Sequence, residues 1–195
     1  VSRAVDAIER HYSEASIDAY AVWSHESDSV TRAELKARGY RYDTSTRAMA
    51  MCLNQIAVPR PEIEVGRGGW HDYLRANDLP AGFLSGIDTT VFHVLIARHD
   101  GKIVGAAVAY DCEGDCGIYS LHTAPEARRK GLGTALTALH LHNARDRGCV
   151  TASVQSTEMA EGVYAAVGFA DLGRYIEYVP SPSQAPARDS SSSHR

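Results

Sequence analysis

The chain has 195 residues, 44% of them hydrophobic, and a formal net charge of -4 at pH 7. This length supports one sizeable core, or one domain with a partial second one. The acidic balance and the lack of Lys/Arg runs argue against a nucleic-acid or membrane-surface partner. No apolar run approaches the roughly 20 residues of a membrane-spanning helix. Polar residues interrupt the segment from Val1 to Tyr20, so we expect no signal peptide and a cytoplasmic location.

The four cysteines, Cys52, Cys112, Cys116 and Cys149, predict no zinc site, because no further ligands accompany them at fixed spacing. Cys112 and Cys116 flank a three-residue loop, where a disulfide across a hairpin is sterically allowed. The alternative is two reduced thiols on neighbouring strands, which suits a cytosolic protein.

The first sixty residues predict two helices and three strands. The helices are expected over Val1–Ser16 and from Ser29, as N-cap, to Arg38, with Gly39 as the stop signal. The strands are expected over Tyr20–Trp23, Tyr40–Tyr42 and Ala48–Leu53, the last two around the turn Asp43-Thr44-Ser45. After Pro59 and Pro61, the sequence predicts a strand over Glu62–Val65, a helix over Trp70–Ala76, and a loop or short helix over Leu79–Gly86.

From Val91 the patterns become regular. Asp100-Gly101 between two apolar runs, Val91–Arg98 and Lys102–Tyr110, predicts a β-hairpin. The following elements are a strand over Gly117–Thr123, a helix over Gly131–Arg147 ended by Gly148, a strand over Val150–Val154, a helix over Glu158–Val167 ended by Gly168, and a strand over Arg174–Val179. The Ser/Pro-rich tail over residues 180–195 is expected to be disordered.

The loop Arg128-Arg129-Lys130-Gly131-Leu132-Gly133 lies between a predicted strand and the start of a long helix. The first N–H groups of a helix have no internal partner and carry partial positive charge. Glycines let the backbone approach an anion, and the three basic residues add charge for a polyphosphate. The loop therefore predicts a pyrophosphate site. The alternative interpretation is a tight turn with a solvated basic loop.

Two other phosphate-binding loops do not fit these residues. A Walker loop needs Gly-Lys-Ser/Thr after four spaced residues, and that sequence is absent. The dinucleotide fingerprint needs a third glycine, but Leu136 stands at its position.

Taken together, these features resemble the GNAT acyltransferase superfamily. Three segments carry the resemblance: the hairpin Asp100–Gly105, the strand and loop Leu121–Thr134, and Val163–Phe169 at the end of a helix. The likeness covers about Glu62 to Val179. It implies an α/β (α+β) fold with a mixed, mainly antiparallel central sheet, flanked by helices and splayed at the acyl-CoA site.

The resemblance implies roles for two groups of residues in binding acetyl-CoA. Leu121, His122 and Thr123 would lie beside the thioester, with the backbone N–H near Leu121 as the oxyanion donor. The pyrophosphate would be held by the loop and helix start, that is by Arg128, Arg129, Lys130, Gly131, Leu132, Gly133 and Thr134. Many members of the family have Asn after the next strand, where this chain has Gln155-Ser156-Thr157, so Gln155 or Ser156 is expected to replace it.

Tyr164 matches the family's general acid and would protonate the departing CoA thiolate, since a phenol with a pKa of about 10 stays protonated at neutral pH. Its alternative role is packing at the helix end.

The general base stays unassigned: the candidates are His122, Glu113, Glu161 or a water chain. His140 and His142 stand two apart on a helix and face different sides, which argues against a metal pair. No cysteine has an evident partner base, which favours direct attack over a covalent enzyme intermediate.

The resemblance therefore implies an acetyl-CoA-dependent N-acetyltransferase acting on a small primary amine, without a metal. Two alternatives stay open: a non-catalytic acyl-CoA-binding module, and an acetyltransferase of protein N-termini or lysines. The acceptor is expected to meet the segment from about Val65 to Thr90.

We expect an N-terminal segment over 1–58, an acyltransferase domain over 59–179 and a tail over 180–195. Leu35–Tyr40 resembles Tyr164–Phe169. Residues 1–58 are therefore interpreted as a partial repeat without coenzyme motif, although any helix that ends in Gly before a strand looks similar. Pairing of strands in this segment would allow a homodimer.

Overall fold

The computed structural model describes residues 1–62 and 65–181. It divides into two compact units: a terminal unit of Val1–Thr46 with the chain from Gly173 onward, and a central unit of Arg47–Leu172. The predicted boundaries at residues 58 and 179, like the partial repeat, stay predictions. Most of the expected tail, residues 182–195, lies outside the described residues.

The terminal unit contains α1 (Ser2–Glu14), β1 (Val22–His25), α2 (Ser29–Ala37), the start of β2 (Arg41–Cys52) and the end of β8 (Ala170–Val179). Its small core consists of Val5, Leu35, Tyr40 and Tyr178. The predicted N-cap Ser29 is wrong by one residue, because the Asp28 side chain accepts the Thr31 N–H at 3.0 Å and caps α2.

The predicted turn at Asp43-Thr44-Ser45 is also wrong, since β2 continues through it as one strand. The strand order is β1-β8-β2-β7-β6-β5-β4-β3, so β2 has a hydrogen-bonded neighbour on each side. β7 pairs only with Arg47–Cys52, so β8 is the neighbouring strand available along the predicted turn. The three residues stay extended against their turn preference, because sheet preference depends strongly on context.

The sheet of the central unit confirms the predicted mixed, mainly antiparallel fold. Its further strands are β3 (Val65–Arg67), β4 (Phe92–His99), β5 (Lys102–Cys112), β6 (Asp115–Thr123) and β7 (Thr151–Ser156). The pairs β2–β7, β3–β4, β4–β5 and β5–β6 are antiparallel, whereas β6 and β7 run parallel. The predicted Asp100-Gly101 hairpin is confirmed: both residues have positive φ, 49° and 74°, as a type I′ turn requires.

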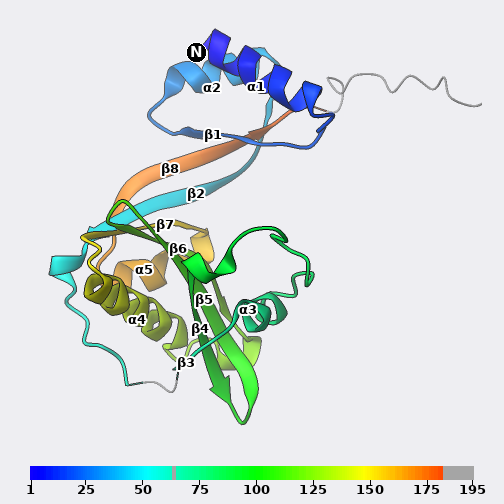
Figure 1. The fold of residues 1–195 in the computed structure, drawn as a ribbon. Coiled ribbons are helices and arrows are strands. Elements are labelled where there is room, and N and C mark those ends of the chain that lie inside the picture. Colours follow the sequence, from blue (N-terminus) through cyan, green and yellow to red (C-terminus); the bar gives the residue numbers. More distant parts are fainter. Residues whose placement is uncertain (63–64, 182–195) are drawn as a thin grey trace, which may run out of the picture. The chain divides into compact units, whose positions relative to one another are not determined.

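Helices cover the two faces of this sheet unequally (Figure 1). α4 (Leu132–Arg147) and α5 (Glu161–Val167) pack on one face, where the main core cluster includes Ile118, Leu141 and Val167. α3 (Trp70–Ala76) packs on the other face, against Val94, Ile96 and Val108 of β4 and β5. The predicted helix over Glu158–Val167 is a 3₁₀ turn, Glu158–Ala160, followed by α5. Three more 3₁₀ turns lie at Leu53–Gln55, Thr89–Val91 and Pro125–Ala127.

Strands β6 and β7 separate part of the way along their length. Their register runs from Asp115↔Thr151 to Ile118↔Val154, and then stops, although β6 continues to Thr123 and β7 to Ser156. On its other side, β6 has an irregularity against β5, where Ser120 and Leu121 have no register partner and Ser120 has a φ of 46°. The sheet is therefore splayed, as predicted, next to Leu121.

Candidate active site

The start of α4 is an open helix N-terminus. Gly131 precedes it with a φ of 78°, Arg129 has a φ of 59°, and no side chain caps the first turn. The exposed loop is held by Arg128, whose Nε donates to the Thr123 carbonyl at 3.0 Å. No acidic side chain stands in the first turn. The first N–H groups and the positive end of the helix dipole thus face solvent, an arrangement that suits an anion.

Gly133 connects this helix start with the splayed strand. A Cβ on Gly133 would lie 3.5 Å from Leu121 Cδ2, 3.8 Å from Thr123 Oγ1 and 3.7 Å from Val163 Cγ1. The structure therefore brings together the predicted loop, the predicted strand residues and the N-terminal half of α5. Leu121 itself packs against two core clusters, which fixes the backbone at the irregularity.

Tyr164 follows Val163 on α5 and is 3% exposed. Its ring meets Phe169 edge-on, with centroids 5.7 Å apart and planes at 72°. Burial raises the pKa of Tyr164 to about 12, because the phenolate would lose its hydration. The phenol therefore stays protonated over the whole physiological range and is able to donate a proton.

The two residues expected to replace the family's Asn differ in exposure. Ser156 is 1% exposed and its hydroxyl donates to the Thr157 carbonyl at 2.9 Å, whereas Gln155 is exposed.

Among the candidates for the general base, Glu161 is paired with Arg47 Nε at 2.8 Å. Glu113 lies in the turn before β6, at the end remote from Leu121. His122 is half-buried on β6, opposite Ala106.

The face of the sheet that carries α3 has polar and aromatic side chains on β6 that the sequence analysis did not single out. Tyr119, 53% exposed, is the first residue of β6 beyond its pairing with β7, and its ring lies over Gly117, whose missing side chain makes the room. On the same strand, Asp115 accepts hydrogen bonds from the Thr151 and Ser153 hydroxyls at 2.7 and 2.5 Å. Alternation along β6 puts both side chains on one face. The sequence contains one signal for this arrangement: Asp115, Gly117 and Tyr119 are spaced two residues apart on a predicted strand, so their side chains share a face.

The cysteines offer no nucleophile at the site. All four thiols are free, and Cys112 stands opposite Asp115 rather than Cys116. Burial raises the pKa of Cys116 to about 12, and burial also raises the pKa of Cys149, so both thiols are protonated and unreactive. Among residues 1–62 and 65–181 there is no group of three potential metal ligands and no helix long and apolar enough to cross a membrane.

Comparison with known proteins places this geometry in a family. Residues 60–169, more than half of the chain, match the profile of the Acetyltransferase (GNAT) family. A mycothiol acetyltransferase from Cellulomonas flavigena is 32% identical over 122 residues, which are 55% of this chain and 32% of that protein. The matched part thus spans about a third of that relative's length.

Two solved structures share the fold at low sequence identity. A GCN5-related N-acetyltransferase from Kribbella flavida aligns with a TM-score of 0.71 and 16% identity, covering 93% of this chain and 76% of the other. A tandem GNAT protein from the clavulanic acid biosynthesis pathway aligns with a TM-score of 0.69 and 15% identity, covering 90% and 68%. The family match, the splayed sheet and the open helix start agree, and the chain belongs to the GNAT acetyltransferase family.

Proposed function

We propose that this protein transfers an acetyl group from acetyl-CoA to a primary amine by direct attack of the amine on the thioester. One observation carries the proposal: the uncapped start of α4 lies next to the opening between β6 and β7, with Val163 of α5, the residue before Tyr164, against Gly133. This combination offers an anion site, a slot for an extended chain and a proton donor in one region.

The residues present fit the coenzyme. The backbone amides of Arg129 to Thr134 would hold the pyrophosphate, with the side chains of Arg128, Arg129 and Lys130 adding charge. The edge of Leu121, His122 and Thr123 that β7 leaves uncovered would hydrogen-bond the pantetheine arm like an additional strand. Gln155, which is exposed, is the better placed of the two replacements for the family's Asn, since the Ser156 hydroxyl is already bonded.

In the reaction, the coenzyme supplies the activated acetyl group and the chain supplies position and electrostatics. The backbone N–H near Leu121 stabilises the oxyanion, a contribution typically worth about 3–4 kcal/mol of barrier. Tyr164 donates its proton to the leaving sulfur, and the buried phenol is a neutral donor at any physiological pH. No residue is assigned as the general base.

The exposed face at Tyr119 is proposed as the place where the amine approaches. The flat ring of Tyr119, close to Leu121 on the same strand, offers a surface for a cation or an apolar chain. The name of the Cellulomonas relative, a mycothiol acetyltransferase, supports a small-molecule acceptor over a protein N-terminus or lysine.

The first experiment is a calorimetric titration with acetyl-CoA, comparing the parent protein with Gly133→Asp. The new carboxylate would stand against the pyrophosphate, so affinity should fall at least tenfold. Gly69→Asp is the matched control: it places the same side chain before helix α3, where nothing lies within 4 Å of the new Cβ.

Equal binding by the folded Gly133→Asp protein would refute the coenzyme site. Binding without CoA release, tested against panels of small amines and peptides, would instead favour a non-catalytic acyl-CoA-binding module.

A further inference from the structure

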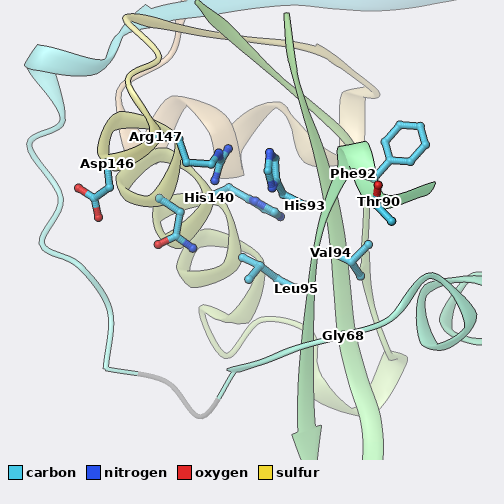
Figure 2. A pocket seen from close by; sticks show the side chains of 10 residues that line it. Gly68, Thr90, Phe92, His93, Val94, Leu95, His140, Asp146 and Arg147 are labelled. Atoms are coloured by element: carbon cyan, nitrogen blue, oxygen red, sulfur yellow. The ribbon is translucent and has the colours of Figure 1, made fainter. Parts of the chain in front are cut away.

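A cavity lies between β4 and the C-terminal half of α4, and none of the coenzyme-loop residues lines it (Figure 2). It has a volume of about 630 Å³ and is open to solvent. His93 and Leu95 line it from β4, and His140, Asn143 and Arg147 from α4. Figure 2 shows the side chains of His93, Leu95, His140 and Arg147 in the space between helix and strand, while Thr90, Phe92 and Val94 lie on the far side of the strand.

His140 is the unusual residue of this cavity. It is 1% exposed; the Ala107 backbone lies near enough to act as a weak hydrogen-bond acceptor, but neither ring nitrogen makes a hydrogen bond of good geometry among the described residues. Burial lowers the pKa of His140 to about 4, so the ring is neutral at physiological pH and presents one N–H donor and one bare nitrogen. A buried polar group without a partner is destabilising. A ligand in the cavity would supply the missing partner.

The polar groups around His140 have their acceptors occupied. The Asn143 side-chain oxygen accepts from Arg60 at 2.7 Å, and the Asp146 carboxylate also accepts from Arg60. Asp111 on β5 accepts from Arg147 Nε at 2.6 Å and Arg147 Nη2 at 2.8 Å, and faces His93 Nε2 at 3.2 Å. The groups without a bonded acceptor in the described part of the chain are donors: the Asn143 amide, Arg147 Nη1 and the His140 N–H.

The charges at the cavity are balanced in pairs. Arg147 is neutralised by Asp111 and Arg60 by Asp146, and His140 is uncharged. A dianion would therefore enter without a compensating charge. A singly charged group with two acceptor oxygens suits the free donors better, and one proton taken up by His140 would balance its charge. Leu95 adds an apolar wall for a short hydrocarbon tail.

We infer that this cavity binds a short-chain monocarboxylate, whose oxygens accept hydrogen bonds from His140, Asn143 and Arg147. The site does not depend on the proposed acetyl transfer. It lies on the same rigid element as the coenzyme loop: α4 has 16 residues, about 24 Å of helix, and begins at the loop and ends at this cavity.

The test is an NMR titration of the histidine ring protons with sodium butyrate, with sodium chloride at equal ionic strength as reference. The His140 signals are assigned by their loss in His140→Leu. We expect saturable shifts of His140 with butyrate only, and a midpoint of its titration at least one pH unit higher when butyrate is bound. Asn143→Leu removes one donor and should weaken butyrate binding at least tenfold.

His142→Gln is the matched control. His142 is buried on the same helix, but its Nε2 contacts the Val58 carbonyl at 3.0 Å outside the cavity, so butyrate binding should survive. Gly133→Asp should also leave it unchanged, which separates this site from the coenzyme site. The inference is overturned if butyrate gives no saturable shift, if Asn143→Leu binds as well as the parent, or if phosphate binds equally well.

Discussion

Replacing Tyr164 by Phe separates chemistry from folding at this site. The substitution removes one oxygen and leaves the ring that meets Phe169 edge-on in the core. The interaction of the Tyr164 side chain in the described structure is this ring contact, which Phe keeps. We therefore expect the free energy of unfolding to change by less than about 1 kcal/mol.

The expected effect on catalysis is much larger. A positioned general acid typically contributes 10²–10⁴-fold in rate, or about 3–5 kcal/mol of barrier. Acetyl-CoA is held mainly by the loop and strand, so its dissociation constant should change less than about threefold, while kcat falls at least about a hundredfold. Because burial raises the pKa of Tyr164 to about 12, the parent enzyme should show no loss of activity from ionisation of this phenol below about pH 11.

The assay is CoA release under saturating acetyl-CoA, together with calorimetric binding and urea unfolding of both proteins. A variant that retains stability and coenzyme affinity but loses turnover supports the proton-donor role. Full activity in Tyr164→Phe would refute it and leave the residue a packing role alone.

Three further predictions follow from the same structure. The pKa of His140 is lowered by burial from 6.5 to about 4, so the unfolded chain binds more protons below neutrality, and the free energy of unfolding should fall by about 2 kcal/mol between pH 7 and pH 5. Urea unfolding at both pH values checks this, and His140→Leu should remove that part of the dependence. The side-chain hydrogen bond from Arg147 holds the pKa of Asp111 down at about 2, so its stabilisation is present above pH 3.8 and is lost as pH falls toward 2. Asp111→Asn should lower stability at pH 7 by about 1 kcal/mol after allowing for solvent screening, measured by thermal unfolding. Tyr119→Ala should raise the KM for the amine severalfold and leave acetyl-CoA affinity unchanged; a change confined to coenzyme affinity would contradict the proposed acceptor face.

The elements with strong local signals were predictable from the sequence. Asp100-Gly101 has the two positive φ angles that its residue types allow, and α4 ends at Gly148, which adopts a φ of 99°. The loop before α4 was located by its glycines and basic residues. In each of these cases neighbouring residues along the chain determine the local conformation.

What depends on distant partners was not predictable. The three residues Asp43-Thr44-Ser45 have turn preferences, yet β2, which has β8 as a neighbour in the sheet, runs through them as one continuous strand. The same limit applies to the cavity at His140. The sequence places this residue on a helix beside Leu136 and Leu141. That its ring is buried without a good hydrogen bond becomes visible only when β4 packs against that helix.

The separation of β6 from β7 gives the sheet an edge in its interior. From Tyr119 to Thr123, the β7 side of β6 has no strand to accept its N–H groups or to donate to its carbonyls. Under the proposed function, the pantetheine arm fills this gap and so adds stability to the fold itself. A ligand at a hundred times its dissociation constant stabilises the folded state by about 2.7 kcal/mol. The melting temperature of this protein should then follow the acetyl-CoA concentration around it, and its lifetime would be linked to the supply of its own substrate.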